Sequence, residues 1–190
     1  MKKICLLFLF SIVFSPLFAQ RQSFTWQDVQ REYIINVPSS WDGQREIPVL
    51  FVLHGLNAEI EETSSQLNAT MFSDLTGWIT IFPQALDANI NVMGQDISLG
   101  KMWNANLSVN IMGMTIAPNS EIDDQGFILS ILDSVKEQYA IDEDSIFVAG
   151  GSMGGFMANY MGIKHSDIFK GMAAISGSVP NILVDSIPSN

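Results

Sequence analysis

The stretch Ser145-Ile-Phe-Val-Ala-Gly-Gly-Ser-Met-Gly-Gly155 decides the fold, because an apolar strand runs directly into a serine bracketed by glycines. The spacing Gly150-x-Ser152-x-Gly154 is typical of a tight strand-to-helix turn that exposes a nucleophilic serine. Glycine suits both flanking positions because a side chain there would collide with neighbouring backbone. A plain glycine-rich turn is the alternative, but the β-prone run before the serine and the helical spacing of apolar residues after it favour the nucleophile.

The same turn predicts an environment that favours negative charge beside Ser152. The following helix directs its free N–H groups and the positive end of its dipole toward the serine. The N–H of Met153 points to where an oxyanion forms when a carbonyl is attacked. Ser152 is therefore predicted as the catalytic nucleophile and Met153 as an oxyanion-hole donor.

Residues 1–19 have the composition of a secretory signal peptide, with Lys2 and Lys3 at the start, an apolar centre and Ala19 at the end. A membrane anchor is the alternative, but the apolar run is short and is interrupted by serines and a proline. We expect a secreted or periplasmic protein with no stable membrane association after cleavage. The single cysteine, Cys5, lies within this segment, so the mature chain is expected to form no disulfide.

The charge balance of the chain is strongly acidic. Loss of the signal removes two of the nine Lys and Arg residues and none of the 20 Asp and Glu residues. Such a surface repels nucleic acid and anionic membranes, and it also keeps an exported protein soluble. Two distant histidines and one cysteine cannot build a usual metal site. We therefore expect no nucleic-acid partner, no metal and no cofactor.

Strands and helices alternate along residues 20–190, which predicts an α/β fold with a mostly parallel sheet and right-handed crossovers. One helix is expected over residues 59–75, with Ile60, Leu67, Met71 and Leu75 on its apolar side. The other predicted elements are a hairpin within 24–37, strands at 48–53, 79–82, 145–149 and 172–175, and helices from Ser120 to near Tyr139 and over 155–164.

Residues 83–119 show no sustained periodicity, so a long loop is predicted there. Its apolar side chains either pack over the sheet or line an adaptable pocket, and both interpretations stay open. These residues are Met93, Met102, Trp103, Met112 and Met114.

The order of these segments resembles the α/β-hydrolase superfamily, and within it the secreted esterases of the polyhydroxybutyrate depolymerase and feruloyl esterase type. The resemblance spans nearly all of residues 20–190 and implies a three-layer sandwich. The stretches that carry it are Arg31-Glu-Tyr-Ile-Ile-Asn-Val-Pro38, Leu53-His-Gly55, Phe82-Pro-Gln-Ala-Leu86, Trp103-Asn104, Asp123-Asp-Gln-Gly-Phe127, Gly150 to Gly155 and His165-Ser-Asp-Ile-Phe169.

The resemblance implies roles for the residues that match these motifs. Ser152 attacks an ester carbonyl, and Met153 N–H is one oxyanion donor. The second donor comes from the loop after the first parallel strand, where Leu56 N–H is the candidate. His54 is expected to fix that loop rather than to react.

Two further motifs of the resemblance concern a candidate substrate contact and the start of a helix. Trp103 is predicted as a substrate-binding residue in the loop before the helix, although Met102 stands where the family often has a cysteine. Asp123 and Asp124 resemble paired catalytic carboxylates, but acids in the first turn of a helix are favoured by its dipole alone. Capping is the preferred interpretation, and Ser120 followed by Asp123 resembles a capping box.

The rest of the catalytic triad does not follow Ser152 in this chain. A serine needs a histidine base and a carboxylate, which come later in the chain in this fold. His165 lies roughly 20 Å along a helix from the turn, at about 1.5 Å per residue. Asp167 lies at the same remote helix end, and Asp185 lies in a tail without strand character. We expect residues 20–190 to be the N-terminal part of an α/β-hydrolase catalytic domain, with its last strands missing and inactive alone.

The expected function is a secreted serine esterase acting on a small-molecule or polymeric ester, with polysaccharide-linked feruloyl or acetyl esters and polyhydroxyalkanoate as candidate substrates. A peptidase or acyltransferase on the same scaffold is compatible with the motif, because fold does not settle function. A non-catalytic binding protein or pseudoenzyme that keeps the serine turn is the alternative from another class.

Overall fold

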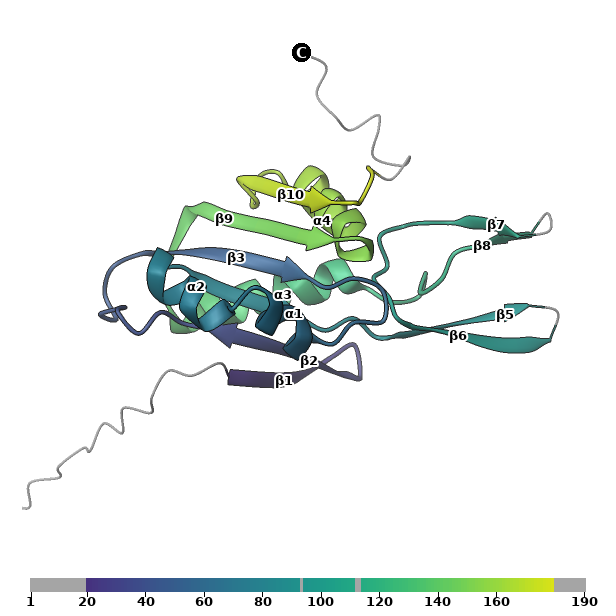
Figure 1. Ribbon diagram of the computed structural model, residues 1–190, viewed down its shortest axis with the longest axis horizontal. Helices are drawn as coiled ribbons and strands as arrows, with labels where there is room; N and C mark the ends of the chain where they lie inside the picture. The colour runs from purple at the N-terminus through teal and green to yellow at the C-terminus, as the bar shows by residue number, and fades with distance from the viewer. Residues whose placement is uncertain (1–19, 93, 112–113, 180–190) are drawn as a thin grey trace, which may run out of the picture.

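A six-stranded sheet forms the centre of the molecule in a computed structural model that describes residues 20–92, 94–111 and 114–179 (Figure 1). The strand order is β1-β2-β4-β3-β9-β10. The strands are β1 (Gln20–Trp26), β2 (Val29–Asn36), β3 (Ile47–Leu53), β4 (Ile79–Pro83), β9 (Ile141–Gly151) and β10 (Gly171–Ile175). The predicted signal peptide and the tail with Asp185 lie outside the described residues.

The pairing within the sheet confirms a mostly parallel arrangement. Strand β3 pairs in parallel with β4 on one side and with β9 on the other, and β10 pairs in parallel with β9. The predicted N-terminal hairpin is β1 and β2, and β2 joins the sheet antiparallel to β4. Because β3, β4, β9 and β10 are parallel, their carboxyl ends meet at one edge, where α/β sheets bind ligands.

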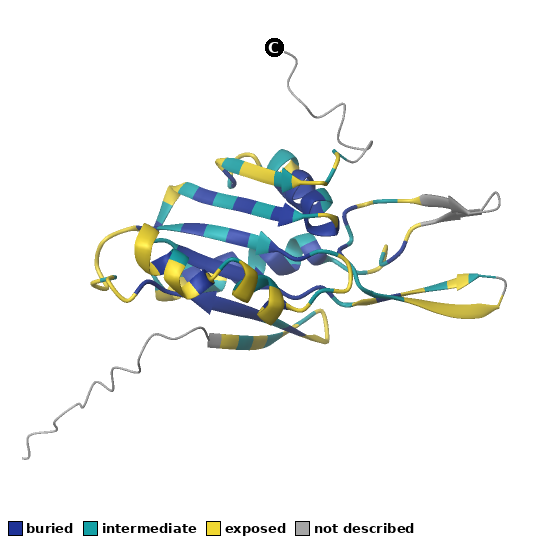
Figure 2. Cartoon of the chain, viewed as in Figure 1, coloured by how far each residue is buried: buried dark blue, intermediate teal, exposed yellow. Residues whose placement is uncertain are grey.

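Helices cover both faces of the sheet (Figure 1). Helices α3 (Asp124–Gln138) and α4 (Met153–Lys164) pack on one face and form the larger core with alternate residues of β3 and β9. Helices α1 (Ile60–Gln66) and α2 (Ala69–Thr76) pack on the other face, in a smaller cluster that includes Ile34 and Phe82. Buried and partly buried residues alternate along β3 and much of β9, as Figure 2 shows. The side chains on one face of these strands are therefore more deeply buried than those on the other.

The helix predicted over residues 59–75 is two helices. Asn68 adopts a left-handed backbone with φ of 51° and separates α1 from α2. This break changes the direction in which the second helix presents its side chains. Met71 and Leu75, expected on a buried side, are therefore 53% and 78% exposed. Gly77 ends α2 in the left-handed conformation, as its position after the helix predicted.

The loop predicted over residues 83–119 contains two β-hairpins instead. They are formed by β5 (Asp87–Val92) with β6 (Gln95–Lys101), and by β7 (Val109–Ile111) with β8 (Met114–Ile116). Both extend away from the sheet on the side of its carboxyl edge (Figure 1). Alternation of apolar and polar residues along Asp87–Val92 was the available signal, but it is only six residues long. Met93 and Met112 lie outside the described residues.

The turn between β9 and α4 has the geometry that its glycines predicted. Ser152 has φ of 52° and ψ of −119°, an uncommon conformation for a residue with a side chain. A β carbon added at Gly150 would lie 2.2 Å from Gly154 O, and one added at Gly154 would lie 2.0 Å from Leu53 O. Such contacts are too short for any side chain, so both positions require glycine. Gly151 has open space around the same position.

The close approach at Gly154 predicts that alanine is tolerated much less well there than at Gly151. We expect Gly154→Ala to destabilise the protein by at least about 2 kcal/mol, because backbone must move to admit the methyl group. Gly151→Ala is the matched control and should change stability by less than about 1 kcal/mol. Denaturant unfolding of the two variants measures this difference, and equal stability of the two would contradict the packing described here.

Candidate active site

Ser152 lies at the carboxyl end of β9, between that strand and α4, and it is exposed. Its backbone is held from both sides. The Ser152 N–H donates to Ile175 O at 2.8 Å, and Ser152 O accepts from Gly155 N–H at 2.9 Å. The main chain is thus fixed by β10 and by the first turn of α4, while the side chain stays accessible.

A pocket of about 480 Å³ opens at Ser152, along the side of the sheet that carries α1 and α2. Its walls are largely apolar, and its floor comes from β3 and β9. The apolar side chains that line it include Leu50, Val52, Leu67, Ala149 and Ile175. The serine therefore stands at the edge of a cavity that can hold an apolar group, as ligand sites usually do.

The two predicted oxyanion donors lie on segments that meet at Ser152. Met153 is the first residue of α4, and Leu56 follows Gly55 in the loop after β3. A β carbon added at Gly55 would lie 3.7 Å from Ser152 Cβ, so this loop and the serine turn are in contact. Within the described part of the chain, neither the Met153 N–H nor the Leu56 N–H has a hydrogen-bond partner. Both groups are free to donate to another acceptor.

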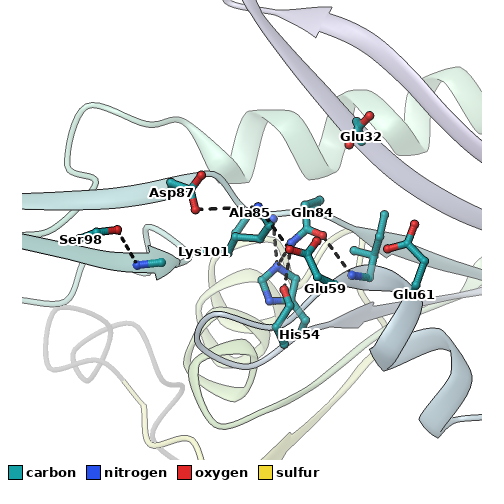
Figure 3. Close-up of polar contacts among 12 residues, drawn as sticks. Glu32, His54, Glu59, Glu61, Gln84, Ala85, Asp87, Ser98 and Lys101 are labelled. Atoms are coloured by element: carbon teal, nitrogen blue, oxygen red, sulfur yellow. Dashed lines mark hydrogen bonds and ion pairs between the residues drawn. The ribbon is translucent and has the colours of Figure 1, made fainter.

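His54 fixes this loop, in agreement with its predicted role (Figure 3). Its imidazole Nε2 accepts the Ala85 N–H at 3.0 Å, and the Gln84 side-chain nitrogen lies 2.9 Å from the same atom. The ring proton must then reside on Nδ1, which lies 2.6 Å from Gly55 O. His54 therefore joins the end of β4 to the loop that carries Leu56.

Burial lowers the pKa of His54 below its ordinary value, while the contact with Gly55 O opposes that shift. The ring is 1% exposed. A second proton, on Nε2, would face the N–H groups of Gln84 and Ala85, which are themselves donors. The neutral imidazole is thus the form that fits this position.

Trp103 was predicted to contact substrate, and the structure places it in the core instead. Its side chain is fully buried, and its indole N–H donates to His54 O at 2.9 Å. Its ring also lies against the His54 ring, with 4.9 Å between the centroids. A buried indole whose only polar group is already bonded does not fit the role of a substrate contact. Met102, beside it, is partly buried and packs on the main core, as the packing interpretation of this segment predicted.

The two acids at the start of α3 have different roles. Asp123 caps the helix, since its Oδ1 accepts the Gly126 N–H at 2.8 Å. The cap is therefore Asp123 and not Ser120. Asp124 is no cap: its side chain is buried, and its Oδ1 lies 2.6 Å from the Arg31 guanidinium. The expectation that both acids cap the helix is wrong for Asp124, because the carboxylate turns inward to a partner 93 residues earlier.

The buried pair of Arg31 and Asp124 is the feature that local sequence patterns missed. Asp124 Oδ2 also accepts the Asn104 N–H at 2.7 Å, and Arg31 donates to Gln84 O at 3.1 Å. Burial raises the pKa of the Asp124 carboxyl, and the attraction of Arg31 opposes this rise. The only sequence signal for these contacts was that both residues lie in stretches carrying the family resemblance.

His165 lies at the far end of α4, as expected for a residue that is not the base. It follows the helix as its C-cap, and its Nε2 lies 2.9 Å from the Gln125 side-chain oxygen. The chain contains two histidines, and both are engaged in contacts other than with Ser152. Among the residues that the structure describes, no cluster of His, Cys, Asp or Glu could hold a metal ion. None of the helices in those ranges is long and apolar enough to cross a membrane.

Comparison with known proteins finds partial sequence similarity to esterases. The sequence pattern of the Prolyl oligopeptidase family matches residues 117–190. Probable feruloyl esterase C of Aspergillus terreus is 24% identical over 149 residues, which cover 78% of this chain and 47% of that protein. Feruloyl esterase B of Piromyces equi is 25% identical over 157 residues, covering 82% and 25%. The chain spans about half, or less, of the length of these relatives.

Solved structures agree with the fold. A thermostable esterase superposes with a TM-score of 0.61 at 15% identity, covering 89% of this chain and 44% of that one. A ferulic acid esterase gives a TM-score of 0.58 at 20% identity, covering 86% and 60%. The chain has the α/β-hydrolase fold. S-formylglutathione hydrolase from Staphylococcus aureus has a TM-score of 0.60 at 15% identity, covering 90% of this chain and 62% of that one.

The lowered pKa of His54 predicts that the folded protein becomes less stable in acid. The unfolded chain takes up a proton near the ordinary value of 6.5, whereas the folded chain resists it until a lower pH. This contribution to stability is therefore complete above pH 6.5 and is lost as the pH falls from 6.5 through the lowered folded pKa. Denaturant unfolding of the complete gene product, measured between about pH 7 and pH 5, tests this loss.

Two variants assign the pH dependence to a residue. His54→Gln should remove most of the decrease in the free energy of unfolding below pH 6.5, because no imidazole remains at the buried position. His165→Gln is the control: burial also lowers the pKa of His165, but its ring is only partly buried, so most of the slope should remain. A wild-type slope that persists in His54→Gln would show that another group is responsible.

Proposed function

We propose that this chain is the nucleophile-bearing part of a secreted serine esterase, which hydrolyses carboxylic esters through an acyl-enzyme on Ser152. The observation that carries the proposal is the contact between the exposed Ser152 and the loop at Gly55, beside two free main-chain N–H groups. A strained, accessible serine at a helix N-terminus is the arrangement that nucleophilic catalysis uses. The named relatives, both feruloyl esterases, support an ester as the substrate.

The proposed reaction begins when Ser152 Oγ attacks the carbonyl carbon of the ester. The serine proton passes to a histidine base, and the carbonyl oxygen becomes an oxyanion that accepts from the N–H groups of Met153 and Leu56. The intermediate then breaks the bond to the alcohol, which leaves with the proton from the base. Water attacks the acyl-serine in the same way and releases the acid.

We assign the base and its carboxylate to sequence outside this chain. His54 and His165 already have other hydrogen-bond partners, and this chain matches only 47% and 25% of the two named relatives. Residues 20–190 would then be the N-terminal part of the catalytic domain, behind a signal peptide at residues 1–19. Feruloyl or acetyl esters on polysaccharides are the preferred substrate class, and polyhydroxyalkanoate is the alternative polymer.

Replacement of the nucleophile tests the proposal. In the complete gene product, Ser152→Ala should lower turnover of short p-nitrophenyl esters by at least about 10³-fold, because no acyl-enzyme can form. Ser166→Ala removes an exposed hydroxyl beyond the far end of α4 and serves as the control, with activity near that of the wild type. Residues 20–190 alone should show no turnover.

The outcomes separate the candidate classes. Unchanged turnover in Ser152→Ala would refute the acyl-enzyme. A complete gene product that binds esters or carbohydrate without hydrolysing any ester would favour the non-catalytic alternative. Hydrolysis of a peptide or acyl transfer to a nucleophile other than water, both dependent on Ser152, would keep the nucleophile and change the substrate class.

The oxyanion donor at position 56 has its own test. Leu56→Pro removes the N–H, whereas Leu56→Ala keeps it while shortening the side chain, which is 51% exposed. Loss of one such donor typically lowers kcat by about 10²-fold to 10³-fold. We expect the kcat of Leu56→Pro to be lower than that of Leu56→Ala by about that factor. Equal kcat values in two folded variants would exclude Leu56 as a donor.

A further inference from the structure

Three consecutive peptide groups of the loop after β3 are each held by a hydrogen bond. The carbonyl of His54 accepts from the Trp103 indole at 2.9 Å. The carbonyl of Gly55 lies 2.6 Å from the His54 ring nitrogen Nδ1. The N–H of Asn57 donates to Lys101 O at 2.8 Å. The loop that carries Leu56 is thus fixed on both sides of the proposed donor.

These bonds determine where the Leu56 N–H points. A trans peptide group is planar, with its C=O and N–H directed oppositely. The Gly55 carbonyl and the Leu56 N–H belong to one such group, so the bond from His54 to Gly55 O also orients the donor. Trp103 contacts His54 twice, through its N–H to the main-chain carbonyl and through its ring, tilted by 42°, against the imidazole.

We propose that Trp103 is a positioning residue for the oxyanion donor at Leu56, acting through the main chain and the ring of His54. The inference rests on the proposed esterase function, because an oxyanion donor is needed only for that chemistry. Trp103 itself touches neither the pocket nor Ser152 among the lining residues that the structure describes. Its proposed effect is on the direction of the Leu56 N–H, which lies two residues after the His54 carbonyl that Trp103 binds.

Trp103 can act in this way because its own position is fixed from the opposite side. The next residue, Asn104, donates its N–H to the buried carboxylate of Asp124. Arg31 pairs with that carboxylate and lies 3.8 Å above the Phe127 ring. The side chain of Asn104 also donates to Ile122 O at 2.7 Å. The segment that carries the indole is therefore held through Asn104 by the buried ion pair that joins β2 to α3.

The segment before Trp103 holds the other side of the loop. Gly100 has φ of 69°, and a β carbon there would lie 2.2 Å from the Asn57 side-chain oxygen. Lys101 then accepts the Asn57 N–H and places its ammonium 3.6 Å from Glu59 (Figure 3). Residues 100–104 thus contact the loop from Trp103 at one end and from Lys101 at the other.

The test is Trp103→Phe in the complete gene product, which removes the indole N–H and keeps an aromatic ring. Because the donor is misdirected rather than removed, we expect kcat for a p-nitrophenyl ester to fall by about tenfold, with KM within about twofold. Trp41→Phe is the matched control. Its indole N–H donates to Arg45 O at the same 2.9 Å, in the loop before β3, and this variant should keep the wild-type kcat.

Amide hydrogen exchange gives a second measurement that needs no activity. In Trp103→Phe, exchange of the Asn57 and Ala58 N–H groups, which donate to Lys101 O and Gly55 O, should become faster than in the wild type, while Trp41→Phe should leave it unchanged. A wild type that is active through Ser152, combined with equal kcat and equal exchange in the two variants, would overturn the role of Trp103 alone. A wild type without Ser152-dependent activity would overturn the proposed function, and faster exchange in Trp103→Phe would still support the positioning contact.

Discussion

The approach of the first turn of α4 to the end of β3 is the constraint on which the candidate site depends. A β carbon at Gly154 would lie 2.0 Å from Leu53 O and 2.6 Å from His54 O, so the helix start touches these carbonyls directly. This packing sets the separation between Ser152, at the helix N-terminus, and the loop that begins at Gly55. Two segments that are nearly 100 residues apart in sequence thus form one site through main-chain contact. The proposed oxyanion donors come from this contact, since both are backbone groups whose places are fixed by packing rather than by rotamers.

Behind the loop lies a buried ion pair whose energetic cost needs an explanation. Removal of Arg31 and Asp124 from water costs several kcal/mol per charge, which their mutual attraction offsets only with good additional partners. Asp124 has such partners in Arg31 and the Asn104 N–H, and Arg31 has the Gln84 carbonyl and the face of Phe127. A pair of apolar residues could fill this space, but it could not bond the Asn104 N–H and the Gln84 carbonyl together. We therefore infer that the ion pair holds the segments at Gln84 and Asn104, which both lie next to residues that contact His54.

Sequence patterns predicted the parts of this structure that depend on local order. The run into Ser152 identified the turn, and continuous apolar runs identified β3, β4 and β9, because buried parallel strands have that composition. The break at Asn68 was missed, since the apolar spacing continues through it while one residue adopts a left-handed backbone. The hairpins after β4 were missed because their strands are short and partly polar. Trp103 and Asp124 were assigned wrongly because their partners lie 49 and 93 residues away, and no local pattern records such contacts.

The electrostatic character of the site follows from which groups near it carry charge. His54 is held neutral by two donors at Nε2, so it brings no positive charge to the loop. The ammonium of Lys101 lies near the carboxylates of Glu59 and Asp87, which offset it. An oxyanion at Ser152 would then be stabilised by oriented main-chain dipoles and the α4 N-terminus rather than by a nearby cation. Dipoles stabilise a developing charge most effectively when they already point toward it, because reorienting them during the reaction would add to the energy barrier. Contacts that fix peptide groups, such as that from Trp103 to His54, therefore matter more to this site than its few charged side chains do.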